Sequence, residues 1–155
     1  MKQFLLAVSI LCLSACGFTP LYAASSNSAG QISVPEIEGR DGHTLRKNIL
    51  LELAPGLPGL EGPATLTIIL EKDLGRLALQ PDEAATRTDI IARADYVLAY
   101  ADTAISGRSE AETSFLVPLA PYSDITSQVD ASDRAMNLLA RRIVDDLRLQ
   151  LGAKD

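Results

Sequence analysis

Residues 87–101, RTDIIARADYVLAYA, determine the fold class, because their side chains alternate between two kinds along the whole stretch. The odd-numbered set begins with charged residues and becomes apolar toward its end, at Val97. The even-numbered set is uncharged and consists of Thr88, Ile90, Ala92, Ala94, Tyr96, Leu98 and Tyr100. A period of two residues places alternate side chains on opposite faces of a β-sheet. The sequence therefore predicts one long strand here, with a buried face and a solvated face.

The segments on either side of this stretch predict two more strands of the same sheet. Asp102 and Thr103 suit a tight turn, so residues 105–116 are expected to return as an antiparallel strand and complete a hairpin. Residues 64–71 alternate apolar and polar side chains, which predicts another half-buried strand. Residues 77–83 either continue that strand for a short distance or form an exposed loop.

A further strand is predicted near the start of the domain, at residues 31–37. Ile32 and Val34 alternate there with polar neighbours, and β-branched residues favour extended backbone. Pro35 supplies no amide hydrogen, so this strand is expected to lie at an edge of the sheet or to end early.

Two amphipathic helices complete the pattern. Asp41 can cap the first, which presents Leu45, Ile49 and Leu53 at four-residue spacing and stops at the prolines and glycines of 55–59. The second is capped by Asp124 or Ser127 and runs to about Leu151; its apolar stripe is Met136, Leu139, Ile143, Leu147 and Leu151. Charged residues four positions apart are predicted to pair on its outer surface, namely Arg141 with Asp145 and Arg142 with Asp146.

The order of these elements is strand, helix, strand, strand, strand, helix. We therefore predict an α+β two-layer sandwich, in which a mixed four-stranded sheet carries two helices packed on one face. Residues 31–155 are long enough for one hydrophobic core and are predicted to form a single domain.

The first thirty residues follow a different pattern. Lys2 precedes an apolar run over 4–13 that is too short to span a bilayer and is typical of a signal peptide, predicted at residues 1–15. Leu13-Ser14-Ala15-Cys16 has the form of a bacterial lipobox, in which the cysteine thiol receives a diacylglyceryl group and becomes the mature N-terminus. A disulfide is the alternative, but the only other cysteine, Cys12, lies in the segment to be removed. Residues 16–30 then form a lipidated N-terminus and a small polar tether.

The residues that follow the lipobox resemble a known family. The stretch Cys16-Gly17-Phe18-Thr19-Pro20-Leu21-Tyr22 is similar to the mature N-terminus of the LPS-assembly lipoproteins, LptE, of Gram-negative bacteria, particularly the alphaproteobacterial type. The resemblance implies a lipid-anchored protein on the periplasmic side of the outer membrane, since Gly17 stands where an aspartate would signal inner-membrane retention. It also implies that the protein plugs the LPS-translocating β-barrel LptD, helps that barrel to assemble, and can contact lipopolysaccharide.

Charge and composition exclude several other classes. Removing residues 1–15 leaves 13 Lys and Arg against 20 Asp and Glu, and such an acidic chain is poorly suited to nucleic acid or to nonspecific binding of anionic lipid. His43 is the only histidine, so a metal centre lacks ligands. We find no nucleophile with a base and no phosphate-binding loop, and we therefore expect no enzymatic activity, no metal and no cofactor.

An LPS contact would require exposed cations beside apolar side chains. The candidates near strand ends or on the polar face of the strand at 87–101 are Lys72, Arg76, Arg87, Arg93 and Arg108. The alternative for each is an ordinary solvated charge. Two other functions stay open at this point: a lipoprotein auxiliary of another lipid-transport system, and a lipid-anchored periplasmic hydrolase.

Overall fold

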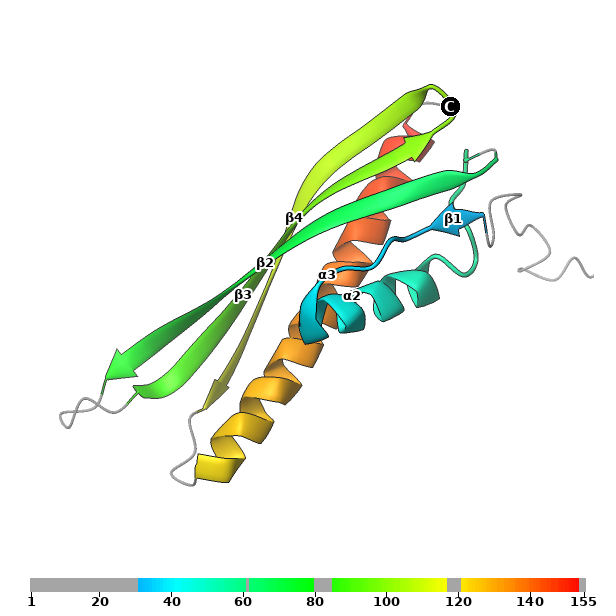
Figure 1. The fold of residues 1–155 in the computed structure, drawn as a ribbon. Coiled ribbons are helices and arrows are strands. Elements are labelled where there is room, and N and C mark those ends of the chain that lie inside the picture. The colour runs from blue at the N-terminus through cyan, green and yellow to red at the C-terminus, as the bar shows by residue number, and fades with distance from the viewer. Residues whose placement is uncertain (1–30, 61, 80–84, 117–120, 154–155) are drawn as a thin grey trace, which may run out of the picture.

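The computed structural model describes residues 31–60, 62–79, 85–116 and 121–153 (Figure 1). Its elements, in chain order, are β1 (Ile32–Ser33), α2 (Gly39–Glu52), β2 (Ala64–Leu79), β3 (Ala85–Tyr100), β4 (Thr103–Leu116) and α3 (Pro121–Gly152). The prediction of an α+β domain with this element order is confirmed.

The four strands form one sheet in the order β1-β2-β3-β4. The β1 strand runs parallel to β2, whereas β2, β3 and β4 pair antiparallel, so the sheet is mixed as predicted. Leu66, Leu98 and Ile105 are in register across the three long strands. This register places the even-numbered residues of β2 and β3 and the odd-numbered residues of β4 on the same face.

That face carries both helices (Figure 1). The apolar stripe of α3 and the buried side chains of α2 join the inward-facing strand residues in a single hydrophobic core. Leu45 and Ile49 of α2, and Leu139, Ile143 and Leu147 of α3, are fully buried there. The predicted two-layer arrangement and both predicted apolar stripes are therefore confirmed.

The strand predicted at 64–71 is longer than expected, because β2 runs without a break to Leu79 and pairs with β3 along its length. Of the two alternatives for residues 77–83, continuation of the strand is therefore correct for 77–79, and residues 80–83 lie outside the described part. A strand of 16 residues and a helix of 32 residues are each roughly 50 Å long, so α3 matches the long hairpin in length. The helix packs against β4 and β3.

The N-terminal strand is shorter than predicted. It lies at the edge of the sheet and ends at Ser33, two residues before Pro35, so the expectation of an edge position with an early end is confirmed. The prediction that strand structure reaches residue 37 is wrong. Val34 and Ile37 are nevertheless buried, and Arg46 of α2 donates a 2.8 Å hydrogen bond to the Val34 carbonyl. This segment therefore packs against α2 after it leaves the sheet.

Both predicted helix starts are wrong by a few residues. The N-cap of α2 is Glu38, which makes no side-chain capping hydrogen bond, while Asp41 lies in the first turn. Similarly, α3 begins at Pro121, which puts Asp124 in its first turn and Ser127 inside the helix. An acidic residue in a first turn interacts favourably with the helix dipole without serving as the cap.

The two ion pairs predicted within α3 do not form. Arg141 instead lies 3.4 Å from the Glu52 carboxylate of α2, and Arg142 donates to the Glu110 backbone carbonyl of β4. Asp145 pairs with Arg148. Because α3 lies between α2 and the edge of the sheet, these side chains have neighbours outside their own helix, which the helical spacing could not reveal.

The turn between β3 and β4 consists of Ala101 and Asp102, and Ala101 has a φ of 46°. This left-handed conformation costs an L-residue about 1–2 kcal/mol, part of which glycine would recover. We expect Ala101→Gly to raise the free energy of unfolding by about 0.5–1 kcal/mol. Chemical denaturation measures the change. In extended β4, the control Ala104→Gly should lower that free energy; a loss in both variants would contradict the prediction.

Candidate functional site

No described helix covers the face of the sheet opposite α2 and α3, and we call it the outer face. Among the described side chains it comprises the odd-numbered residues of β2 from 65 to 75, the odd-numbered residues of β3 from 87 to 99, and the even-numbered residues of β4 from 104 to 116. The sequence of 87–101 predicted that its odd-numbered side chains lie on a solvated face, and the structure confirms this except at Asp89, which is buried. A sheet with one solvated face offers a broad surface to a partner.

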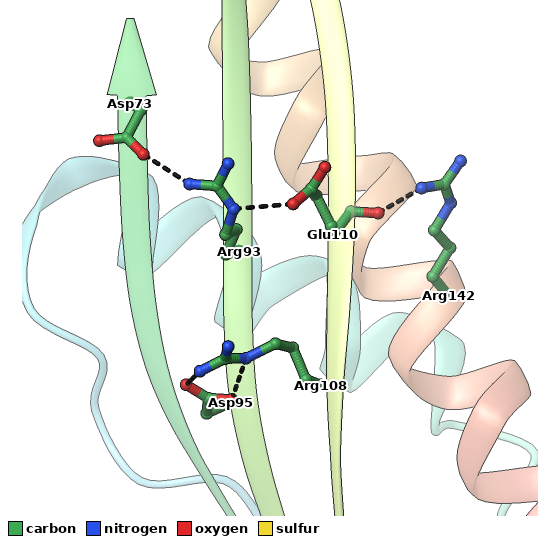
Figure 2. Close-up of polar contacts among 6 residues, drawn as sticks. All are labelled: Asp73, Arg93, Asp95, Arg108, Glu110 and Arg142. Atoms are coloured by element: carbon green, nitrogen blue, oxygen red, sulfur yellow. Dashed lines mark hydrogen bonds and ion pairs between the residues drawn. The ribbon is translucent and has the colours of Figure 1, made fainter.

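Arginine side chains tie the three long strands together across the outer face (Figure 2). Arg93 of β3 bridges both neighbours: Nη1 lies 2.6 Å from Asp73 of β2, and Nε donates a 2.7 Å hydrogen bond to Glu110 of β4. Arg108 of β4 holds Asp95 of β3 through two hydrogen bonds of 2.6 and 2.7 Å. Two parallel bonds fix the planar guanidinium more tightly than a single contact would.

These contacts shift the pKa values of both arginines and of Asp95. The pKa of Arg93 is raised, chiefly by its hydrogen bond to Glu110 and then by that to Asp73. The hydrogen bonds from Arg108 lower the pKa of Asp95, and the same contacts raise the pKa of Arg108. The contacts therefore favour the charged forms of Arg93, Arg108 and Asp95.

Two of the five cationic candidates, Arg93 and Arg108, form cross-strand ion pairs on the outer face, and the other three have different surroundings. Arg87 is on the outer face beside Asp89, with 2.9 Å between Nε and Oδ1, and Asp89 is only 4% exposed. Arg76 lies opposite Thr88 in the register, and its side chain is outside the described part. Lys72 lies well inside β2, which continues to Leu79, whereas Arg76 is three residues from that strand end.

Lys72 is also on the other side of the sheet from Arg93. It is in register with Ala92, a buried residue of the helix-covered face, and its Nζ contacts the Asp41 carboxylate of α2. A cavity of about 320 Å³ surrounds this pair and is lined also by Arg40 and by side chains from the first half of α3. Lys72 therefore joins β2 to α2 and is not part of the outer face.

An apolar depression of about 330 Å³ adjoins the ionic network on the outer face. Ile69 and Val97 line it and are 65% and 43% exposed. Asp95 stands at its margin. The alternation pattern placed both apolar residues on the solvated face, but it could not show that the surface is hollowed there.

The sequence analysis missed the contact that attaches α3 to the middle of the sheet. The Tyr96 hydroxyl donates a hydrogen bond to Asp146 of α3, and Gln150 donates to the same carboxylate at 3.1 Å. Gly107 lies opposite Tyr96 on β4, and a methyl group there would stand 2.5 Å from Tyr96 Cζ. The absence of a side chain at Gly107 is what lets the tyrosine ring cross β4 to reach the helix.

Burial raises the pKa of the Tyr96 hydroxyl, and its hydrogen bond to Asp146 raises it further. Because the folded protein holds this proton more tightly than the unfolded chain does, stability is full below about pH 10 and falls above it. We expect Tyr96→Phe to lower the free energy of unfolding by about 1–3 kcal/mol at neutral pH. Denaturation at pH 8 and pH 10.5 should show a smaller alkaline loss in the variant; identical pH profiles would contradict this explanation.

Two arginines of α3 cover part of the free edge of β4. Arg142 donates to the Glu110 carbonyl, and Arg134 donates a 3.4 Å hydrogen bond to the Ser114 carbonyl. In a third contact the donor is on the strand: the Thr113 hydroxyl of β4 donates a hydrogen bond to the Ala131 carbonyl of α3. Edge strands with unpaired carbonyls tend to pair with other chains, and these contacts occupy such groups over the second half of β4.

The described residues also bear on membrane insertion and on metal binding. None of the helices in those ranges combines the length and the apolar character needed to cross a bilayer. The same part of the chain contains no group of three or more His, Cys, Asp or Glu residues arranged to hold a metal ion. Cys16, the predicted lipidation site, precedes the first described residue.

The fold and the bare outer face define a small α+β domain that presents one open sheet surface. The same fold occurs in bacterial lipoproteins. A protein from Caulobacter crescentus CB15 assigned as a lipoprotein matches with a TM-score of 0.62 and 23% identity, over 84% of this chain and 98% of that one. Rare lipoprotein B from Shewanella oneidensis matches with a TM-score of 0.59 and 12% identity, over 81% and 98%.

A minor lipoprotein from Acinetobacter baumannii shares the fold at a TM-score of 0.54 and 10% identity, over 77% of this chain and 92% of that one. No family model and no curated protein sequence matches the chain. At these identities the likeness is one of fold. It agrees with the lipoprotein-like architecture that the N-terminal resemblance implied.

Proposed function

We propose that this protein is an outer-membrane lipoprotein of the lipopolysaccharide-assembly machinery, which plugs the LPS-translocating β-barrel and helps that barrel to assemble. The observation that carries the proposal is the bare outer face, a polar surface crossed by the Arg93 and Arg108 networks. The lipobox at Cys16 and the fold shared with rare lipoprotein B support it.

A plug has to meet a water-lined lumen with a surface that is polar and holds its shape. The interiors of large outer-membrane barrels are polar, whereas their lipid-facing surfaces are apolar. The outer face meets both requirements, because cross-strand ion pairs connect β2, β3 and β4 over its central region. The helix layer supplies rigidity from behind through the shared core.

The anchor places the domain close to the membrane that holds such a barrel. Residues 17–31 separate Cys16 from β1 and can extend to at most roughly 54 Å, so a lipid on Cys16 would keep β1 within that distance of the bilayer surface. Two or more acyl chains on one residue give stable anchoring, because each buried methylene contributes about 0.8 kcal/mol. The proposed role is therefore binding and assembly beside the barrel, without catalysis.

Direct contact with lipopolysaccharide is a less favoured part of this role. Lys72, Arg87, Arg93 and Arg108 are each paired with a carboxylate. A phosphate group that approached one of them would have to displace that carboxylate. Lipopolysaccharide contact is therefore weakly supported at these positions.

Affinity purification of the full chain through a C-terminal tag tests the proposal. We expect mild-detergent extracts of the native organism to yield the LPS-translocating barrel in amounts comparable to the tagged protein. Depletion of the chain should also reduce the mature barrel and surface lipopolysaccharide. A purification without that barrel, or a depletion that disturbs only phospholipid trafficking, would contradict the proposal; the latter would indicate a lipoprotein of another lipid-transport system.

A further inference from the structure

The charge on the outer face identifies the kind of surface that it fits. Its described positions hold three arginines, Arg87, Arg93 and Arg108. They hold six carboxylates, which are Glu71, Asp73, Asp89, Asp95, Glu110 and Glu112. The face is therefore acidic overall.

The three arginines of the outer face already form ion pairs with carboxylates of the same face. Arg93 is shared by two carboxylates, and Arg108 and Arg87 hold one each. Glu71 and Glu112 are exposed, and within the described part of the chain neither has a cation at ion-pair distance. They flank the network, Glu71 on β2 and Glu112 on β4. Glu71 also interacts electrostatically with Arg108, without an ion-pair contact. An approaching partner thus meets an exposed carboxylate without an ion pair on each side of the central arginine.

The net negative charge of the outer face excludes several kinds of binding partner. An anionic membrane surface and lipopolysaccharide phosphates would both be repelled by the outer face. A second copy of the chain that packed face to face would bring two acidic surfaces together, and like charges across an interface are unfavourable. A partner with lysine or arginine side chains is attracted.

The depression beside the ion pairs indicates a second property of the partner, the shape of the side chain that it inserts. Its apolar floor, with Ile69 and Val97 exposed, fits an aliphatic or aromatic side chain rather than a charge. Apolar anchors surrounded by polar contacts are the usual anatomy of specific protein interfaces.

We propose that the outer face docks a basic protein surface, whose lysines and arginines contact Glu71 and Glu112 while one apolar side chain enters the depression at Ile69 and Val97. This inference rests on the proposed function, because the candidate surface is the wall or an extramembrane segment of the LPS-translocating barrel.

Charge reversal tests this inference in the full lipidated chain. Glu71→Lys/Glu112→Lys is compared with Asp130→Lys/Asp145→Lys, which makes the same change of net charge at exposed positions of α3 in the helix layer. Each tagged variant is expressed with the barrel of the same organism, and the barrel recovered per tagged chain is measured. We expect about tenfold less barrel for the outer-face variant in 0.1 M salt and less than a twofold change for the control.

Zero-length carbodiimide coupling supplies a second readout on the unmodified protein, because it joins carboxylates to lysine amines that touch them. We expect Glu71 or Glu112 to be linked to barrel lysines. Equal barrel recovery from the two double variants, or links found only at Asp130 and Asp145, would overturn the inference. A wild-type chain that recovers no barrel would instead overturn the proposed function, so the two failures are distinguishable. Thermal unfolding of each variant checks that the fold is intact.

Discussion

Cys16→Ala is expected to transfer nearly all of the protein from the membrane fraction to the soluble periplasmic fraction. The alanine has no thiol to accept the diacylglyceryl group, so the acyl chains that hold the domain to the bilayer are lost together. Nothing in the described ranges replaces them, since no helix there is apolar and long enough to cross a bilayer. Fractionation followed by immunoblotting measures the shift.

The matched control is Cys12→Ala, which removes the other cysteine of the chain but lies in the predicted signal peptide. This variant should stay in the membrane fraction, and mass spectrometry should find its mature N-terminus lipidated. Full membrane retention of Cys16→Ala, with an unmodified N-terminus in the wild type, would contradict the lipid-anchor prediction.

Gly107→Ala is expected to remove much of the stability of the domain. The added methyl group would lie 2.5 Å from Tyr96 Cζ and closer still to its hydroxyl, so the ring has to leave its place against α3. Overpacking costs about 1–3 kcal/mol, and the lost hydrogen bond to the Asp146 carboxylate adds a similar amount. Domains of this size are stable by about 5–15 kcal/mol, so the midpoint of thermal unfolding should fall by roughly 10 °C or more.

Gly75→Ala is the matched control, because Gly75 is also a strand residue and a methyl group there meets nothing within 4 Å. It should leave the melting temperature unchanged or raise it slightly. Gly107→Ala should also cost little when it is added to Tyr96→Ala, since the ring that it displaces is then absent. If Gly107→Ala lowered the stability equally with and without the Tyr96 ring, displacement of that ring could not be the cause.

The repeat of apolar side chains along the sequence predicted the fold well, because each long helix and strand buries one of its faces and exposes the other. The even-numbered side chains of β3 from Thr88 to Leu98 are buried and Ile91, Arg93 and Asp95 are not, as the alternation indicated, although the odd-numbered Asp89 is buried. The stripe of α3 from Met136 to Leu151 is buried as its spacing indicated. Such patterns are visible in sequence because each element has one core face and one solvent face.

The features that periodicity missed depend on neighbours distant in the chain. The extension of β2 to Leu79 is stabilised by pairing with β3, although its own sequence contains Gly75. The bridge of Arg93 to Asp73 and Glu110 depends on the register of three strands. The same holds for the contact of Tyr96 with Asp146, which joins residues 50 positions apart.

For the candidate site, the sequence identified the cations but not their partners. It placed Arg93 on a polar face, and the structure adds that two carboxylates already hold it. Lys72 looked like a solvated strand residue, but its even position on the extended β2 directs it toward α2. A carboxylate partner on another element carries no signal in a single sequence.

The proposed role as a barrel plug is tested most directly by photocrosslinking in living cells. A photoreactive amino acid replaces Arg87, whose side chain is half-exposed on the outer face, or Ser106, an exposed residue on the same face beside the depression. We expect irradiation to link both positions to the LPS-translocating barrel. Adducts that contain only other proteins, or none in cells that hold normal levels of both partners, would contradict the proposed function.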